Sequence, residues 1–465
     1  MSVARYLISR QVRRSDRHRC LVIVPTHGRR QRSGPPALDV SGSPGQTRFV
    51  PLNSLEQRVV DAIDPDAVVR DLASLVAIPS VGGSAAEVAV QRWCARRLTE
   101  LGGRVDVWDL DLQALRAADG YPGEEVVRDA ALGCVATFGD RPTALILAGH
   151  TDVVPSGDLR NWSFDPWRLN RDGDRLVGRG SCDMKGGPAA VFGAIAALRA
   201  SGLTMPSIAV HCVIGEEDGG LGTFGTLERG HGGDACVLAE PTDHRAVTAN
   251  AGSLTFHLEV PGRAAHGSVR TQGVSAFDAA APVFAALREL EARRNRDVDP
   301  MVSHLDVAYP LSIGVVRAGD WASTVPDLLV AEGRYGVRIG EPVEQARAEL
   351  EAAVAAACAD DPWLSAHPAK VSWPGGVFAP GSLAEGHPLL DQVREACADA
   401  AEWKVEPTGA PYGSDLRLYT GAGIPTLQLG PGEVAAAHTA DESVPYTDLI
   451  DCARAYAVLA LRLGS

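Results

Sequence analysis

The first half of the chain alternates between helical and strand-like patterns of apolar residues. Between residues 65 and 103, apolar positions recur every three or four residues, which predicts two amphipathic helices separated at Ile78-Pro79-Ser80. A further Ala-rich helix is expected over 186–202. Strand-like apolar runs lie at 105–110, 133–139, 143–149, 207–215 and 234–240. This βαβ rhythm predicts an α/β fold with a mostly parallel, buried sheet.

Near residue 253 the pattern changes to that of a second, smaller unit. Strands are expected at 253–260, 311–319, 328–339 and 369–373, with helices at 275–294 and 342–358. This β-α-β-β-α-β order predicts a ferredoxin-like α+β sheet with helices on one face. Motifs with catalytic character resume after it, so we interpret it as an insertion. The predicted plan is a catalytic domain of 55–252 and 366–465, interrupted by a lid and dimerisation domain of 253–365.

Composition and charge narrow the class of protein. A chain of 465 residues is long enough for two domains, and it is 45% hydrophobic and 22% charged, as is usual for a globular protein. No stretch reaches the roughly 18 apolar residues of a membrane helix, so no membrane association is expected. A net charge of −14 argues against nucleic acid as a partner.

The N-terminal segment and the cysteines bear on localisation. Residues 1–54 are predicted to be a disordered, Arg-rich extension, although a transit peptide would share this composition. The nine cysteines form no CxxC pair or cluster, which favours buried free thiols over a disulfide framework. We therefore expect a cytoplasmic protein.

Five short motifs along the chain contain acidic residues or histidine. They read His150-Thr-Asp152, Asp183-Met-Lys-Gly-Gly, Glu216-Glu217-Asp218, Glu240-Pro-Thr and His438-Thr439. Three of them directly follow a predicted strand, and in open α/β sheets ligands bind beyond the carboxyl ends of the strands. Taken singly, each has an ordinary explanation as a structural histidine, a helix cap or a solvated acid. Together they predict one polar site at a single edge of the sheet.

The residue types in these motifs suit a pair of metal ions. Two histidines, one aspartate and two glutamates give three ligands per ion if Asp183 bridges. Mixed nitrogen and oxygen ligands favour Zn²⁺, with Co²⁺ or Mn²⁺ as alternatives. Two ions about 3.5–4 Å apart can share a hydroxide and polarise a carbonyl. Of two adjacent glutamates, one can bind metal while its neighbour takes a proton from water.

On these motifs the chain resembles the M20 family of metallopeptidases and deacylases. That family includes acetylornithine deacetylase, succinyl-diaminopimelate desuccinylase, aminoacylase and glutamate carboxypeptidase. The resemblance spans roughly residues 65–460. It rests on GHTDVVP, GRGSCDMKGG, IGEEDGG, LAEPT, a Gly-Arg-Ala-Ala-His266 segment and the terminal His438.

The resemblance implies a role for each residue of the metal site. His150 and Glu240 would hold one metal ion. Glu217 and His438 would hold the other, and Asp183 would bridge the two. The Asp183–Met184 peptide bond is expected to be cis.

The resemblance also implies three catalytic residues outside the ligand set. Glu216 would be the general base, and Asp152 would orient the metal-bound histidine. His266, carried by the inserted domain, would stabilise the oxyanion, often across a homodimer formed through residues 253–365.

Substrate contacts are implied less directly. Arg334 and Arg338 lie near the position where relatives bind a substrate carboxylate, and Gly413-Ser414 resembles a substrate-side loop. Many relatives carry Asn shortly before the Val-Pro-Asp of the lid. Here residues 322–327 read Ala-Ser-Thr-Val-Pro-Asp, so a substrate contact is expected to differ.

We therefore expect a dinuclear metal-dependent hydrolase that cleaves the amide bond of N-acyl amino acids. A dipeptidase or carboxypeptidase of the same family is the alternative, because both cleave an amide next to a free carboxylate. An aminopeptidase agrees less well with the inserted domain. A catalytically inactive binding protein is a remote alternative, since all five ligands and Glu216 are present.

Overall fold

A computed structural model describes residues 51–465 of the chain. The predicted Arg-rich extension therefore lies outside the described residues, apart from its last four. Helix α1 (Ser54–Asp61) is the first helix of the described residues. The Asn53 side chain accepts hydrogen bonds from the N–H groups of Leu55 and Glu56, and the Glu56 carboxylate accepts one from the N–H of Asn53. This capping box satisfies N–H groups that a helix start leaves without partners.

The larger sheet is mixed, whereas the sequence predicted a mostly parallel one. Its strands run in the order β1-β2-β6-β3-β7-β16-β8-β14, and β15 also pairs with β8. The parallel pairs are β3 with β6 and β7, β7 with β16, and β8 with β15; the other pairs are antiparallel. The bounds are β1 Arg104–Asp109, β2 Leu132–Thr137, β3 Leu145–His150, β6 Ile208–Val213, β7 Cys236–Leu238, β8 Arg245–Asn250, β14 Gly381–Ser382, β15 Glu406–Ala410 and β16 Thr426–Gln428.

The connection between β1 and β2 explains part of this difference. A parallel pair needs a crossover of a dozen or more residues, usually with a helix that packs on the sheet. Between β1 and β2 the chain forms only the five-residue helix α4 (Leu112–Arg116). The two strands therefore pair as antiparallel neighbours, with Arg104 opposite Thr137.

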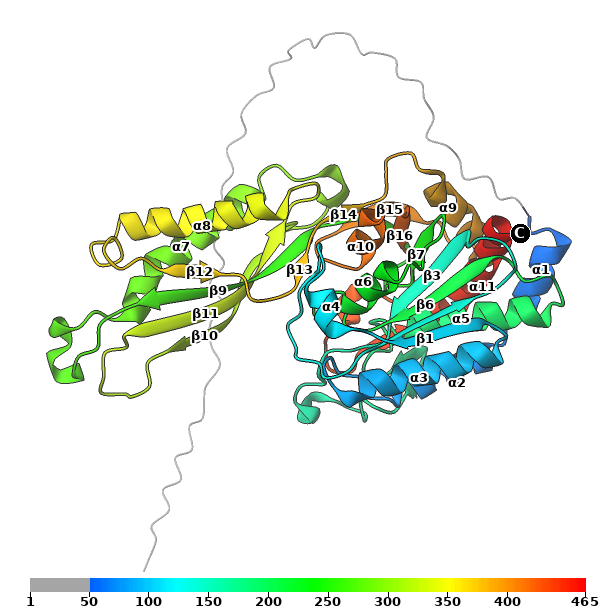
Figure 1. Ribbon diagram of the computed structural model, residues 1–465, viewed down its shortest axis with the longest axis horizontal. Helices are drawn as coiled ribbons and strands as arrows, with labels where there is room; N and C mark the ends of the chain where they lie inside the picture. The colour runs from blue at the N-terminus through cyan, green and yellow to red at the C-terminus, as the bar shows by residue number, and fades with distance from the viewer. Residues whose placement is uncertain (1–50) are drawn as a thin grey trace, which may run out of the picture. The chain divides into compact units, whose positions relative to one another are not determined.

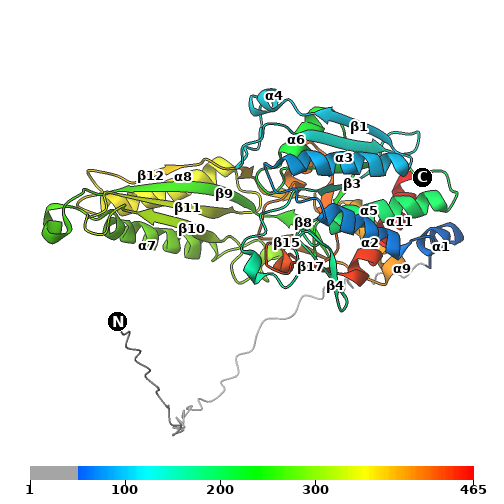
Figure 2. The ribbon, with the colours of Figure 1, turned by 90° about the horizontal axis from the view of Figure 1, so that it is seen from below.

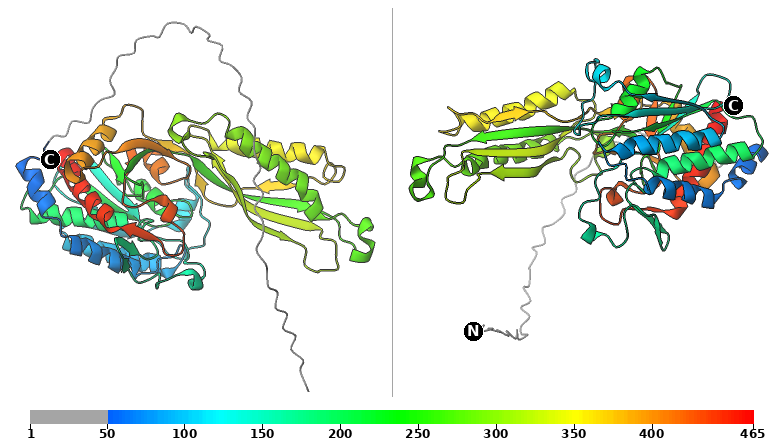
Figure 3. Two further views of the ribbon diagram at one scale, coloured as in Figure 1. Left: turned by 180° about the vertical axis from the view of Figure 1, so that it is seen from behind. Right: turned by 60° about the horizontal axis from the view of Figure 1, so that its bottom comes forward.

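Helices cover the larger sheet, as Figures 1 and 3 show. They are α2 (Pro65–Val76), α3 (Ala85–Glu100), α5 (Gly186–Ala200), α6 (Leu221–Glu228), α9 (Pro388–Ala401), α10 (Leu416–Gly421) and α11 (Tyr446–Gly464). Helix α5 is buried on almost every side, and α11, which the sequence pattern did not predict, belongs to the same core. A Cβ at Gly193 would lie 2.4 Å from the Val68 side chain, so the glycine permits the close approach of α2 and α5.

The second sheet has the predicted β-α-β-β-α-β order. Its strands β9 (Gly252–Pro261), β10 (Leu311–Ala318), β11 (Leu328–Val337) and β12 (Lys370–Ser372) lie in the antiparallel order β10-β11-β9-β12. Buried and half-buried residues alternate along β9, as expected for a strand with one covered face. Helices α7 (Ala276–Arg294) and α8 (Val343–Ala359) pack with it around a separate core (Figures 1 and 2). Strands β12 and β13 (Val377–Phe378) extend this sheet beyond residue 365.

A small third sheet brings the C-terminal region close to the turn that carries Asp183. Strand β17 (Ser443–Pro445) pairs with β5 (Arg175–Val177), which pairs with β4 (Asn170–Asp172). This pairing places the residue before β17, Glu442, beside the turn that carries Asp183.

Two expectations from composition can be compared with the described residues. The eight cysteines between residues 51 and 465 are all buried and free, as predicted, and Cys20 lies outside that range. Within the same range, no helix has the length and apolar character needed to cross a bilayer.

Candidate metal centre

His150 ends strand β3 with both ring nitrogens engaged. Its Nδ1 lies 3.0 Å from the backbone oxygen of Asp152 and 3.5 Å from the Asp152 carboxylate. Its Nε2 lies 3.1 Å from Asp183 Oδ1 and 3.9 Å from carboxylate oxygens of both Glu216 and Glu240. The ring is 1% exposed, so Nε2 faces a buried group of acids.

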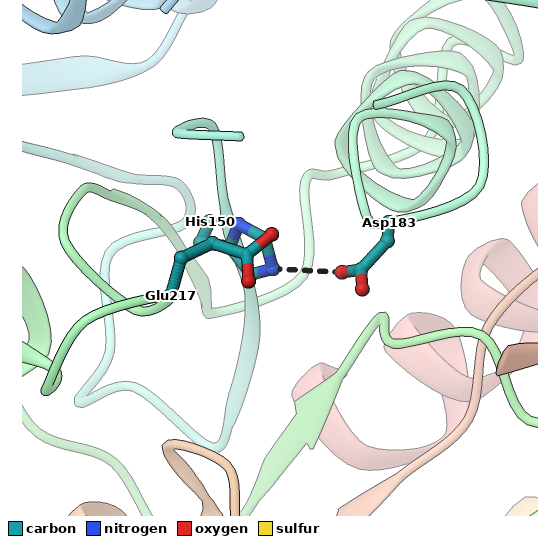
Figure 4. Close-up of side chains that lie close together, drawn as sticks. All are labelled: His150, Asp183 and Glu217. Carbon is teal, nitrogen blue, oxygen red and sulfur yellow. Dashed lines mark hydrogen bonds and ion pairs between the residues drawn. The ribbon is translucent and has the colours of Figure 1, made fainter. Parts of the chain in front are cut away.

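A second histidine approaches the same acids from the C-terminal segment. His438 Nε2 lies 3.0 Å from Glu217 Oε2 and 3.5 Å from Asp183 Oδ2. The two oxygens of Asp183 therefore face different histidines, Oδ1 toward His150 and Oδ2 toward His438. Figure 4 shows the carboxylates of Asp183 and Glu217 beside the His150 ring. A bridging carboxylate needs this arrangement.

The structure brings all five predicted ligands and Glu216 together. Two groups have ligand atoms within 4.8 Å of one another: His150 with Asp183 and Glu217, and His150 with Glu216 and Glu240. Glu217 thus lies against His438, whereas Glu216 lies on the side of His150 and Glu240.

The electrostatics of this group fit divalent cations. Burial, with Glu240 nearby, raises the pKa of Glu216 well above its usual range. Burial, reinforced by the Asp183 charge, raises the pKa of Glu240 to about 8. Ionised carboxylates this close are costly in a buried site unless cations neutralise them. Neighbouring imidazole and carboxylate donors are the ligand types that Zn²⁺ and similar metals take.

Asp152 supports both sides of the site. It is fully buried, and its carboxylate accepts hydrogen bonds from the backbone N–H groups of Glu216 (3.4 Å) and Glu217 (3.2 Å). It also faces Nδ1 of His150. One carboxylate thus orients a histidine ring and the backbone of the loop that carries the two glutamates.

Glu442 is a buried residue of the site that the sequence analysis did not single out. Its Oε1 accepts hydrogen bonds from the N–H groups of Cys182 and Asp183, both at 3.0 Å. Its other oxygen lies 2.5 Å from Nη1 of Arg179, which is also buried. The peptide bond between Asp183 and Met184 is cis, as expected. The only sign of Glu442 in the sequence was its place four residues after His438.

The site opens into a cavity of about 230 Å³. The cavity is lined by Asp183, Glu216, Glu217, Glu240, Pro241, Tyr412, Gly413, Ser414, Val434, Ala437 and His438. Two predicted substrate-side residues, Gly413 and Ser414, are therefore at the cavity, and Tyr412 was missed. A Cβ at Gly413 would lie 2.3 Å from Cβ of Phe378, so packing also requires glycine there. The Ser414 hydroxyl accepts a hydrogen bond from Gln428 at 2.9 Å.

Three predicted residues neither line this cavity nor belong to the cluster of histidines and acids behind it. His266 lies on an exposed turn, where its Nδ1 is 2.8 Å from the Ser268 hydroxyl. Arg334, on β11, forms an ion pair with Glu125 at 2.9 Å. Arg338 donates a hydrogen bond to the backbone oxygen of Arg294 at 3.4 Å.

A mixed sheet that carries a cluster of imidazole and carboxylate donors is typical of an α/β metal-binding protein. Residues 146–462 match the sequence model of peptidase family M20/M25/M40. The chain belongs to this family, as the motifs indicated, and it is a metal-dependent hydrolase.

Known proteins similar to this chain have several activities. The chain is 28% identical over 386 residues to N-formyl-4-amino-5-aminomethyl-2-methylpyrimidine deformylase of Bacillus subtilis, covering 78% of this chain and 86% of that protein. It is 29% identical over 330 residues to acetylornithine deacetylase of Vibrio campbellii, covering 68% of this chain and 80% of that protein. Human carnosine dipeptidase 1 has a similar fold, with a TM-score of 0.68 at 16% identity, covering 89% of this chain and 100% of that one.

Proposed function

We propose that the protein is a dinuclear amidohydrolase that removes the acyl group from N-acyl amino acids. The observation that carries this proposal is the placement of Asp183, whose two carboxylate oxygens face two histidines from distant parts of the chain. A carboxylate in this position can serve two metal ions at once. The other donors lie around it, with Glu240 near His150 and Glu217 near His438.

The ligand sets proposed are those that the family resemblance implies, and the short distance within each pair of donors supports them. His150 and Glu240 would hold one metal with Asp183, and Glu217 and His438 would hold the other. When bound, such a metal pair lowers the pKa of water towards 7 and polarises a carbonyl. We propose Zn²⁺ as the native metal, with Co²⁺ or Mn²⁺ as alternatives.

Glu216 is proposed as the general base. It lines the cavity beside the predicted ligands, and the neighbouring Glu217 is the one that lies against His438. Its carboxylate would accept a proton from the attacking water and return it to the leaving amine. Asp152 would keep the backbone of Glu216 in place during this transfer.

The named relatives favour removal of a small acyl group. One is a deformylase and the other a deacetylase, so both release a short acyl group from nitrogen. The likeness to a dipeptidase shows the shared fold only. For this reason we place deacylation first and dipeptide or carboxypeptide cleavage second.

The organisation of the chain completes the proposal. Residues 55–252 and the part of 366–465 that follows β13 would form the catalytic domain, and the smaller sheet with its two helices a lid through which two copies of the chain form a homodimer. His266 would act from that lid. We also propose that the enzyme is cytoplasmic.

A turnover screen tests the substrate class. N-acetyl, N-formyl and N-succinyl amino acids and unmodified dipeptides are supplied to the purified enzyme with Zn²⁺, Co²⁺ or Mn²⁺. We expect at least one N-acyl amino acid to be hydrolysed with a higher kcat/KM than any dipeptide. Turnover of dipeptides alone would replace the deacylase by a peptidase, and no turnover of either would favour a binding protein.

A further inference from the structure

A buried arginine outside the metal centre holds the loop that carries the proposed base. The side chain of Arg128 is 0% exposed and lies between two carboxylates. Its Nη1 and Nη2 donate to the two oxygens of Asp218 at 2.8 and 2.7 Å. Its Nε and Nη2 donate to the two oxygens of Glu87 at 2.9 Å each. One guanidinium is thus bidentate to both partners.

Asp218 directly follows Glu216 and Glu217, so this contact is made to the loop itself. Its Oδ2 also accepts hydrogen bonds from the backbone N–H groups of Glu125 (3.0 Å) and Val126 (3.1 Å). The loop is therefore fixed on one side by Asp152 and on the other by the segment 125–128. Glu216 is itself bonded to Asp152 and lies two residues before the second attachment, Asp218.

The loop is rich in glycine, and its internal backbone hydrogen bonds run from the N–H of Gly219 to Glu216 at 3.2 Å and from the N–H of Gly220 to Gly215 at 2.6 Å. Gly215, Gly219 and Gly220 flank the acids, and all three have positive φ angles of 70°, 152° and 90°. Glycine at such positions leaves the backbone many alternative conformations. A Cβ at Gly215 would lie 3.2 Å from Nη2 of Arg128, so the guanidinium packs against the backbone just before Glu216. Arg128 therefore contacts the loop on both sides of the two glutamates.

Stability alone does not account for a network of this geometry. Buried ion networks are often no better for stability than apolar residues of similar volume. What a doubly bidentate guanidinium adds is fixed geometry, which lysine cannot reproduce. We propose that Arg128 is a positioning residue that sets the place of Glu216 through Asp218. This inference rests on the proposed role of Glu216 as general base.

Arg128→Lys tests the inference because it keeps the positive charge and removes the planar guanidinium that is bidentate to both carboxylates. We expect kcat to fall by about 10²-fold, the cost typical of a misplacement near 1 Å, with KM and metal content close to wild type. In Arg128→Ala, added guanidinium chloride at tens of millimolar should restore part of kcat, and an equal concentration of sodium chloride should not.

Arg294→Lys is the matched control. Arg294 is also a buried arginine bidentate to one carboxylate, Glu341 at 2.5 and 3.0 Å, but it lies in the smaller sheet's core region, away from the cavity. Its replacement should lower the melting temperature and leave kcat unchanged. If Arg128→Lys behaves like this control, or loses metal together with activity, the positioning role is wrong.

Glu216→Gln shows whether the positioning role of Arg128 or the proposed function itself is wrong. If Glu216→Gln retains both metals and loses activity while Arg128→Lys retains wild-type kcat, only the inference on Arg128 is overturned. If Glu216→Gln is active, the assignment of the base is itself wrong.

Discussion

The backbone N–H of Asp183 donates a hydrogen bond to the carboxylate of Glu442, 259 residues further along the chain and 3.0 Å away. Through this bond a residue of the C-terminal segment holds the turn of the proposed bridging ligand. Because Glu442 is also paired with the buried Arg179, its position is itself restrained. The bridging geometry therefore depends on contacts between two distant parts of the sequence, residues 179–183 and Glu442.

Glu442→Gln should weaken metal binding. The amide keeps the shape of the side chain, but it removes the charge opposite Arg179 and weakens the bonds to the Asp183 turn. Outer partners of metal ligands typically contribute about 10–100-fold in affinity, and we expect a loss in that range. Titration of Zn²⁺ with a competing chelator measures it. Glu385→Gln, at an exposed position, is the control, and equal affinity in the two variants would contradict the prediction.

Glu216→Gln should abolish turnover without releasing metal. Glutamine has nearly the same size but cannot accept the proton from water. Loss of a general base typically lowers kcat by about 10²–10⁴-fold. Metal analysis of the same preparation should still find two ions per chain. Loss of one ion would make Glu216 a ligand, a possibility consistent with its 3.9 Å approach to His150.

His266→Ala should lower kcat by about 10²–10³-fold, the usual effect of removing an oxyanion donor. The residue lies on an exposed turn, so its removal should affect neither folding nor metal content. If it serves the site of a partner subunit, mixing His266→Ala with Glu216→Gln should restore activity in hybrid dimers. An unchanged kcat in the single variant would leave His266 as a turn residue bonded to Ser268.

Arg334 and Glu125 should have opposite effects on substrate affinity. The guanidinium of Arg334, which we expect to bind the substrate carboxylate, is paired with the Glu125 carboxylate at 2.9 and 3.0 Å. Arg334→Ala should raise KM by roughly 10–100-fold, the equivalent of a charged hydrogen bond of about 1.5–3 kcal/mol. Glu125→Gln should lower KM because it frees the guanidinium. The amide of the same N-acyl amino acid is the control substrate, and a similar change in its KM would refute carboxylate binding by Arg334.

The clustering of the proposed metal ligands could be predicted from the sequence because their positions obey local rules. His150, Glu216 and Glu240 follow apolar runs that are buried strands, and the carboxyl ends of such strands meet at one edge of the sheet. The smaller sheet was also predictable, since β9 alternates strictly between buried and half-buried positions. In both cases a short stretch of sequence contains the whole signal.

The supporting residues could not be predicted in the same way. Glu442 acts on backbone N–H groups 259 and 260 residues away, and Arg128 acts on Asp218 90 residues away. Such contacts depend on tertiary packing. In the sequence alone, a single Arg or Glu is indistinguishable from a solvent-exposed charged residue. Helix α11 was not predicted, although its apolar residues recur with a helical period.

The most direct test of the account is the number of metal ions that the active site binds. Metal-free enzyme is titrated with Zn²⁺ while binding and hydrolysis of an N-acyl amino acid are followed together. The account predicts saturation at two ions per chain in wild type and loss of the bridged pair in Asp183→Ala. Full activity with no metal, or saturation at a single ion whose affinity does not depend on Asp183, would contradict it.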